Sequence, residues 1–216
     1  MCFSASASFA AGAVLTVVGV ASLKKTKKPS EIPFAVIPLF FGLQQFAEGF
    51  VWLSLTNPDY AFIEGISTYA FIFFAQVLWP VWVPFAIFKF EEEKGLRSIL
   101  GKGLVGIGII VATTLVYYLF TSEIEAEILG HHISYNQAYL QQFSLLGGIL
   151  YLAAIAIPPF MSLNKKMWLL GSAVFGAYIL TEIFYSQYVV SVWCFFAAIL
   201  SAMVLWIVIT KTKDSK

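Results

Sequence analysis

Long apolar stretches follow one another along most of the chain, and short polar or charged segments separate them. A helix needs about 20 mostly apolar residues to cross a bilayer, and seven stretches approach or exceed that length. The pattern therefore predicts an all-α integral membrane protein, a seven-transmembrane helix bundle that forms a single domain over residues 1–216. The expected spans are approximately 5–23, 32–55, 66–88, 103–120, 142–163, 167–186 and 189–210.

Composition agrees with this class of protein. Of the 216 residues, 60% are hydrophobic and 12% are charged, whereas soluble domains are about half apolar and about one quarter charged. A soluble fold of this size could not hide so much apolar surface from water. The apolar composition predicts the lipid bilayer as a partner. The formal net charge of +1 gives no strong positive potential that would attract nucleic acid, so no nucleic-acid partner is predicted.

The positive charges predict the orientation of the chain. All thirteen follow the first, third, fifth or seventh expected span, and cations near span ends remain on the cytoplasmic side. We therefore expect the N-terminus outside, the C-terminus in the cytoplasm, and the acidic connection 121–141 as an aqueous loop on the outside. The cations are Lys24, Lys25, Lys27, Lys28, Lys89, Lys94, Arg97, Lys102, Lys165, Lys166, Lys211, Lys213 and Lys216.

Two glutamates lie inside expected spans, Glu48 in the second and Glu182 in the sixth. An intramembrane carboxylate is costly unless it is protonated, paired or in contact with water, and it commonly marks a functional site. At about 3.6 residues per turn, each shares a helix face with aromatic or hydrogen-bonding side chains. The residues expected to line one outward-facing cavity with these glutamates are Gln44, Gln45, Trp52, Gln76 and Tyr178.

Such a cavity suits a cation or a proton. No lysine or arginine lies inside an expected span, so neither glutamate has an evident cationic partner, and either carboxyl could exchange protons near neutral pH. The structural alternative is that both glutamates are neutral acids that join helices through hydrogen bonds, with Gln44 and Gln45 assisting.

A short pattern in the second span recurs in the sixth. Phe41, Gly42 and Glu48 are matched by Phe175, Gly176 and Glu182 at a constant offset of 134 residues. This spacing favours two three-helix units joined by the fourth span. Units separated by four spans point the same way, so the repeat would be a parallel 3+1+3 arrangement.

Histidine and cysteine on the expected outer side raise the possibility of a metal site formed by His131, His132 and Cys2. Imidazole and thiolate suit zinc or copper, although this spacing matches no ligand signature and a solvated histidine pair is the simpler reading. Cys2 could instead form a disulfide with Cys194. No other cofactor is predicted, and the sequence lacks the P-loop, Gly-x-Ser-x-Gly and His-Glu-x-x-His motifs.

Two segments resemble an uncharacterised group of small bacterial integral membrane proteins. They are the start, Met1-Cys2-Phe3-Ser4-Ala5, and the Gln-Gln-x-x-Glu-Gly-x-x-Trp segment that runs from Gln44 to Trp52. The likeness is strongest over residues 1–55. It implies a multi-pass protein of the bacterial inner membrane and no particular activity.

Three functions are compatible with these features. The favoured hypothesis is a small-solute or ion transporter with a carboxylate-lined outward-facing cavity, for which proton coupling and assembly as a homo-oligomer are open options. A seven-helix sensor or receptor is the second, although the short inner loops leave little surface for a partner. The third is a membrane-embedded metal-binding enzyme.

Overall fold

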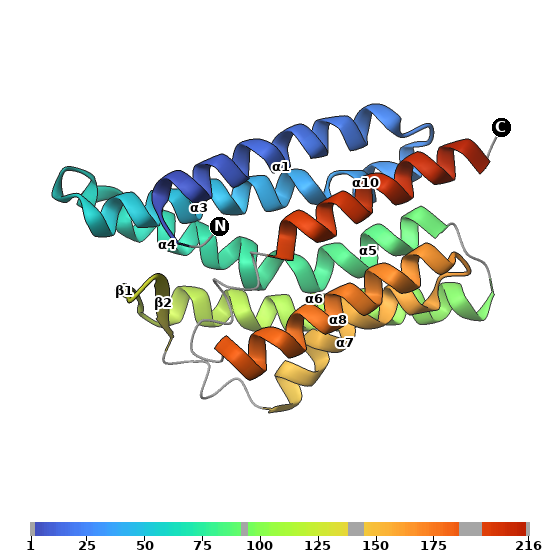
Figure 1. The fold of residues 1–216 in the computed structure, drawn as a ribbon. Coiled ribbons are helices and arrows are strands. Elements are labelled where there is room, and N and C mark those ends of the chain that lie inside the picture. Colours follow the sequence, from blue (N-terminus) through green and yellow to red (C-terminus); the bar gives the residue numbers. More distant parts are fainter. Residues whose placement is uncertain (1–2, 92–94, 138–144, 186–195, 215–216) are drawn as a thin grey trace.

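The computed structural model describes residues 3–91, 95–137, 145–185 and 196–214. The described chain is helical apart from one β-hairpin (Figure 1). Its first half contains α1 Ala5–Lys25, η1 Pro29–Glu31, α2 Ile32–Ala35, α3 Ile37–Thr56, η2 Pro58–Ile63, α4 Glu64–Ile72, η3 Phe73–Leu78 and α5 Trp79–Glu91. The second half contains α6 Leu96–Thr121, β1 Ile124–Leu129, β2 His132–Gln137, α7 Leu145–Met161, α8 Lys165–Tyr185 and α10 Ala197–Asp214.

Five helical segments in this described part are long and apolar enough to cross a membrane: Ala5–Lys25, Pro29–Thr56, Pro58–Glu91, Leu96–Thr121 and Lys165–Phe184. Two shorter apolar helices, Leu145–Met161 and Ala197–Lys211, lie where the fifth and seventh spans were expected. Residues 138–144 and 186–195, where those two spans were expected to begin, are outside the described residues.

The helices run side by side, and the described cations gather at one end of the bundle (Figure 1). These cations lie at or near the carboxyl ends of α1, α5 and α10 and the amino ends of α6 and α8. The hairpin, which contains Glu125 and Glu127 and directly follows Glu123, lies at the opposite end. This separation of charge is the arrangement that the positive-inside rule requires.

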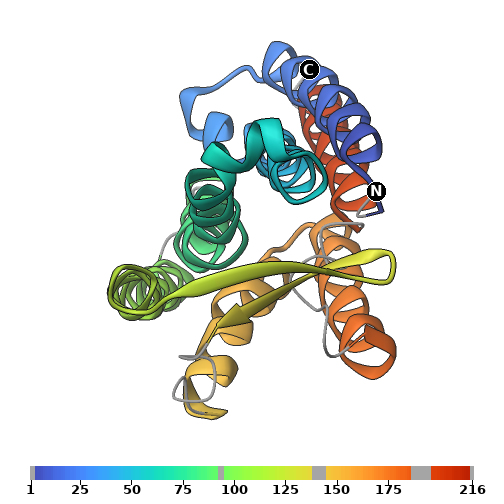
Figure 2. The ribbon, with the colours of Figure 1, turned by 90° about the vertical axis from the view of Figure 1, so that its left-hand side faces the viewer.

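The connection 121–141 was expected to be an aqueous loop, and the structure corrects this. Strands β1 and β2 pair antiparallel with Leu129 opposite His132, so a two-residue turn joins them. Gly130 occupies this turn with φ 64°, a conformation that suits glycine. Ile133, Tyr135 and Gln137 alternate along one buried face of β2. The hairpin lies across the end of the bundle (Figure 2).

Close packing of α1 against α3 fixes the position of α3. A Cβ atom added to Gly42 would lie 2.9 Å from Thr16 Oγ1 and 3.1 Å from the carbonyl oxygen of Gly12. Small residues at this crossing therefore let the two backbones approach, as is common in membrane bundles. On its other side α3 contacts α4, η3 and β1.

The segment η3, between α4 and α5, is a π-helix. A π-helix is rare and frequently marks a functional site, because its wider turn changes which backbone groups are paired. The carbonyl oxygen of Ala75 in η3 accepts a hydrogen bond from the Tyr151 hydroxyl at 3.1 Å, which ties η3 to α7. Gln76, predicted from sequence as a site residue, lies in this π-helix.

Candidate functional site

One face of α3 carries four of the predicted site residues into the interior. Gln45 and Glu48 are 0% exposed, Gln44 is 2% exposed and Trp52 is 5% exposed. Gln44 and Gln45 each lie one helical turn before Glu48, and Trp52 lies one turn after it, so the four side chains share one side of the helix. The Gln45 Nε2 group donates a hydrogen bond to Glu48 Oε2 at 3.2 Å. Glu48 is thus enclosed by the protein.

Gln44 connects α3 to α5. The Trp79 indole Nε1 donates to Gln44 Oε1 at 3.1 Å, and the Trp79 ring packs on Phe41 with centroids 4.2 Å apart. Trp79 immediately follows the π-helix, so this contact fixes the entry of α5 beside the buried face of α3.

Gln76 connects the π-helix to the hairpin. Its Nε2 group donates to Gln137 Oε1 at 2.9 Å, and both side chains are buried. The Phe71 ring stacks on Tyr135 with centroids 4.8 Å apart, which holds β2 against α4. Sequence reasoning missed Gln137. The alternation of Ile133, Tyr135 and Gln137, after a turn at Gly130, is the signal that could have found it.

Together these buried side chains form what we call the polar core. It consists of residues from α3, α4, η3 and β2, namely Gln44, Gln45, Glu48, Trp52, Thr68, Gln76 and Gln137. Trp52 packs in one apolar cluster with Phe71, Ala75 and Tyr135, which come from the same elements as Thr68, Gln76 and Gln137. The polar core therefore extends from the middle of α3 to the underside of the hairpin.

Four buried atoms of the polar core have no hydrogen-bond partner within the described residues: Gln45 Oε1, Trp52 Nε1, Thr68 Oγ1 and Gln137 Nε2. Buried polar groups are nearly always satisfied, and ordered water is the usual partner when the protein supplies none. Donors and acceptors are both represented among these atoms. The polar core has the chemistry to hold water or a small polar ligand.

Glu182 has different surroundings. It lies on the exposed side of α8 beside Ile183 and Phe184, which are 68% and 70% exposed, whereas Thr181 and Ala177 form the buried side. Tyr178, one turn away on the same helix, is half-buried and interacts electrostatically with Glu182. Of the two predicted carboxylates, the described structure encloses only Glu48.

The two copies of the predicted repeat also differ in their packing. Phe41 packs against Trp79 and Gly42 lies against α1. Phe175, by contrast, is 44% exposed, and a Cβ added to Gly176 would meet nothing within 4 Å. The 3+1+3 arrangement stays a prediction about topology, while the polar chemistry is concentrated in the first copy.

Of the histidines of the predicted metal site, His131 lies in the hairpin turn and His132 begins β2. His131 is exposed, and the half-buried His132 ring packs on Phe3 with centroids 5.2 Å apart. Burial, and then the neighbouring His131, lower the pKa of His132 below 6.5. Within the described residues no three His, Cys, Asp or Glu side chains lie close enough to share a metal ion. Cys2 and Cys194 lie outside those residues.

These features define the class: an α-helical protein whose described part has five helical segments long and apolar enough to cross a membrane, and whose interior carries a carboxylate and several amides. The chain belongs to a family of unknown function, DUF6629, whose model matches residues 1–216. No curated protein matches the chain, and no solved structure matches it either.

Proposed function

We propose that this protein moves protons across the membrane, alone or together with a small solute or cation, and that Glu48 carries the proton. The observation that supports this proposal is the complete burial of Glu48 in a polar core whose members include unsatisfied donors and acceptors. A buried ionisable group inside a membrane bundle is a functional-site hypothesis by default.

The neighbouring amide suits either protonation state of Glu48. Gln45 Nε2 donates to the carboxylate, while Gln45 Oε1 has no protein partner within the described part of the chain. An amide offers a donor and an acceptor on one group, so a flip of the Gln45 carboxamide by about 180° would let its oxygen accept from a protonated acid. Glu48 can thus gain or lose a proton while the hydrogen bond between Glu48 and Gln45 is kept.

The hairpin gives the proposed cycle an outer gate. Glu48 has no exposed surface, so the described conformation is closed, and the outward-facing cavity expected from sequence requires movement of the covering elements. The Gln76 to Gln137 hydrogen bond and the Phe71 to Tyr135 stack are the contacts that such a movement would break. The role of Glu182 and Tyr178 beside Glu48 stays a prediction from sequence and is not part of this proposal; because Glu182 lies on the exposed side of α8, it provides the comparison variant below.

A flux assay tests the proposal without knowledge of the solute. The purified chain is reconstituted into vesicles that enclose a pH-sensitive dye, and a potassium diffusion potential is applied with and without external sodium. We expect proton entry with the native chain, its loss with Glu48→Gln, and its retention with Glu182→Gln. Equal flux through Glu48→Gln and the native chain would refute the proposed role of Glu48.

A further inference from the structure

A cavity lies between α5, α6 and α7, at the end of the bundle opposite the hairpin. It is an open groove, whose empty space of about 340 Å³ includes the solvent at its mouth. It shares no residue with the polar core, and any function it has is independent of Glu48.

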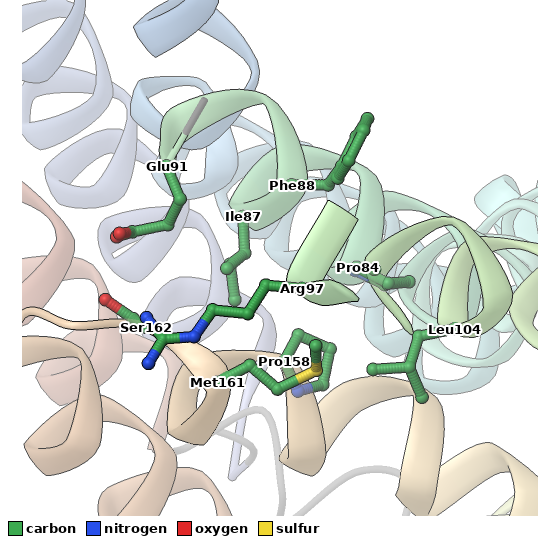
Figure 3. Close-up of a pocket in the computed structure, with 10 residues that line it drawn as sticks. Pro84, Ile87, Phe88, Glu91, Arg97, Leu104, Pro158, Met161 and Ser162 are labelled. Atoms are coloured by element: carbon green, nitrogen blue, oxygen red, sulfur yellow. The ribbon is translucent and has the colours of Figure 1, made fainter. Parts of the chain in front are cut away.

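The lining of this cavity has two chemically different parts. Its wall is apolar and comes from Pro84, Ile87, Leu104, Pro158 and Met161. Figure 3 shows a polar mouth, where the Arg97 guanidinium extends toward Ser162 and the Glu91 carboxylate lies on the α5 side. A ligand that fills this cavity needs a polar head and an apolar tail.

The position of the cavity indicates where such a ligand comes from. Beside the mouth, α6 presents Leu96, Ile99 and Leu100, which are 70%, 66% and 50% exposed. Apolar side chains this exposed at the edge of a membrane helix face lipid. The mouth also lies at the end where the described cations gather, and basic pockets between helices at such an end attract anionic headgroups.

We propose that this cavity binds an anionic phospholipid. The Arg97 guanidinium and the Ser162 hydroxyl hold the phosphate, and one acyl chain follows the apolar wall between α5 and α7. Arginine suits this task because its planar fork offers five N–H donors and matches phosphate geometry. With five donors it can contact Glu91 and a phosphate together, but the negative charge of Glu91 weakens the affinity.

Lipid titrations of the purified full-length chain in detergent, followed by native mass spectrometry, test this assignment. Phosphatidylglycerol is compared with phosphatidylcholine of the same acyl chains and with inorganic phosphate. Arg97→Gln removes the proposed headgroup contact, Leu104→Trp fills the apolar wall, and Glu91→Gln removes the opposing charge. Lys102→Gln is the matched control, because Lys102 is a cation on the same helix outside the cavity lining.

We expect one phosphatidylglycerol to bind, about tenfold more weakly to Arg97→Gln and more tightly to Glu91→Gln, with little change for Lys102→Gln. Leu104→Trp should also weaken the binding of phosphatidylglycerol, so the proposal can still be tested if Arg97→Gln does not fold. Equal losses for Arg97→Gln and Lys102→Gln would overturn the proposal. Displacement by inorganic phosphate, or equal binding of phosphatidylcholine, would overturn the lipid assignment as well.

Discussion

At the scale of single residues, the buried glutamines explain how a carboxylate can lie inside an apolar bundle. The Gln45 amide donates to Glu48, Gln44 links α3 to α5, and the Gln76 to Gln137 hydrogen bond links the π-helix to the hairpin. Each amide carries both donors and an acceptor, so neighbouring groups can be satisfied in more than one arrangement. Such adaptable hydrogen bonding is what a group that changes its charge requires.

The Gln76 to Gln137 pair allows a direct test of this interpretation. Gln76→Leu or Gln137→Leu alone leaves the remaining buried amide without this partner and should lower the free energy of unfolding by about 1–3 kcal/mol. The double Leu variant removes both polar groups and should lose less than the sum of the single losses. Unfolding in denaturing detergent measures the three values. Strictly additive losses would show that the pair is not coupled.

His132 predicts a dependence of stability on pH. Because burial lowers its pKa below 6.5 in the folded protein, the unfolded chain binds more protons at lower pH. The contribution of neutral His132 to the free energy of unfolding is therefore complete above pH 6.5, and it declines as the pH falls below that value. The melting temperature should be lower at about pH 5.5 than at about pH 7.5.

The His132→Gln variant should reduce this difference between the two melting temperatures. His131→Gln should retain most of the difference, since burial is the larger cause of the lowered pKa. An unchanged difference in His132→Gln would place the pH-dependent group elsewhere.

At the scale of elements, much of the helical architecture is predictable from sequence, because a lipid environment imposes length and apolarity on each crossing helix. The segments 5–23 and 32–55 fall within the first two helical segments that could cross a membrane, Ala5–Lys25 and Pro29–Thr56. The expected span 66–88 lies within Pro58–Glu91, but its hydropathy gives no sign of the π-helix. The change of backbone pairing in η3 depends on contacts with α7 and the hairpin, which are distant in the chain.

The hairpin was missed for a different physical reason. Charged and polar residues in 121–141 suggested solvent, yet the strand β2 is amphipathic and buries Ile133 and Tyr135. The burial of Gln44, Gln45, Glu48, Trp52 and Gln76 agrees with the sequence expectation that polar groups in spans point inward. The different surroundings of Glu182 could not be read from spacing alone, since periodicity groups residues on a face without indicating what that face contacts.

The α1–α3 contact supplies an element-scale prediction with an internal control. Gly42→Leu forces atoms against Thr16 and the backbone of α1 and should destabilise the protein by about 1–3 kcal/mol. Gly176→Leu occupies the equivalent position of the proposed repeat, where a Cβ meets nothing within 4 Å, and should have little effect. Thermal unfolding compares the two. Equal destabilisation would contradict the close approach of α1 and α3.

At the scale of the whole molecule, charge is separated between the two ends of the bundle. Glu125 and Glu127 lie in the hairpin and Glu123 directly precedes it, whereas the described lysines and arginine lie near the opposite helix ends. If this chain follows the positive-inside rule, the hairpin faces the outside and the phospholipid cavity faces the cytoplasm. The polar core would then be entered from the outer surface.

Labelling of single cysteines tests this orientation in intact cells. After Cys2→Ser and Cys194→Ser replacement, Glu125→Cys on the hairpin should react with a membrane-impermeant maleimide. Lys102→Cys near the opposite end should react only after the membrane is permeabilised, because both side chains are exposed and differ in the side they face. The reverse pattern would invert the proposed topology.

Infrared difference spectroscopy tests most directly whether Glu48 exchanges a proton with water inside the membrane. Reconstituted protein is cycled between about pH 5 and about pH 8, and the carbonyl band of a protonated carboxylic acid is followed. We predict a reversible band that disappears in Glu48→Gln and persists in Glu182→Gln. A spectrum in which no reversible band is lost in Glu48→Gln would contradict a proton-carrying role for this residue.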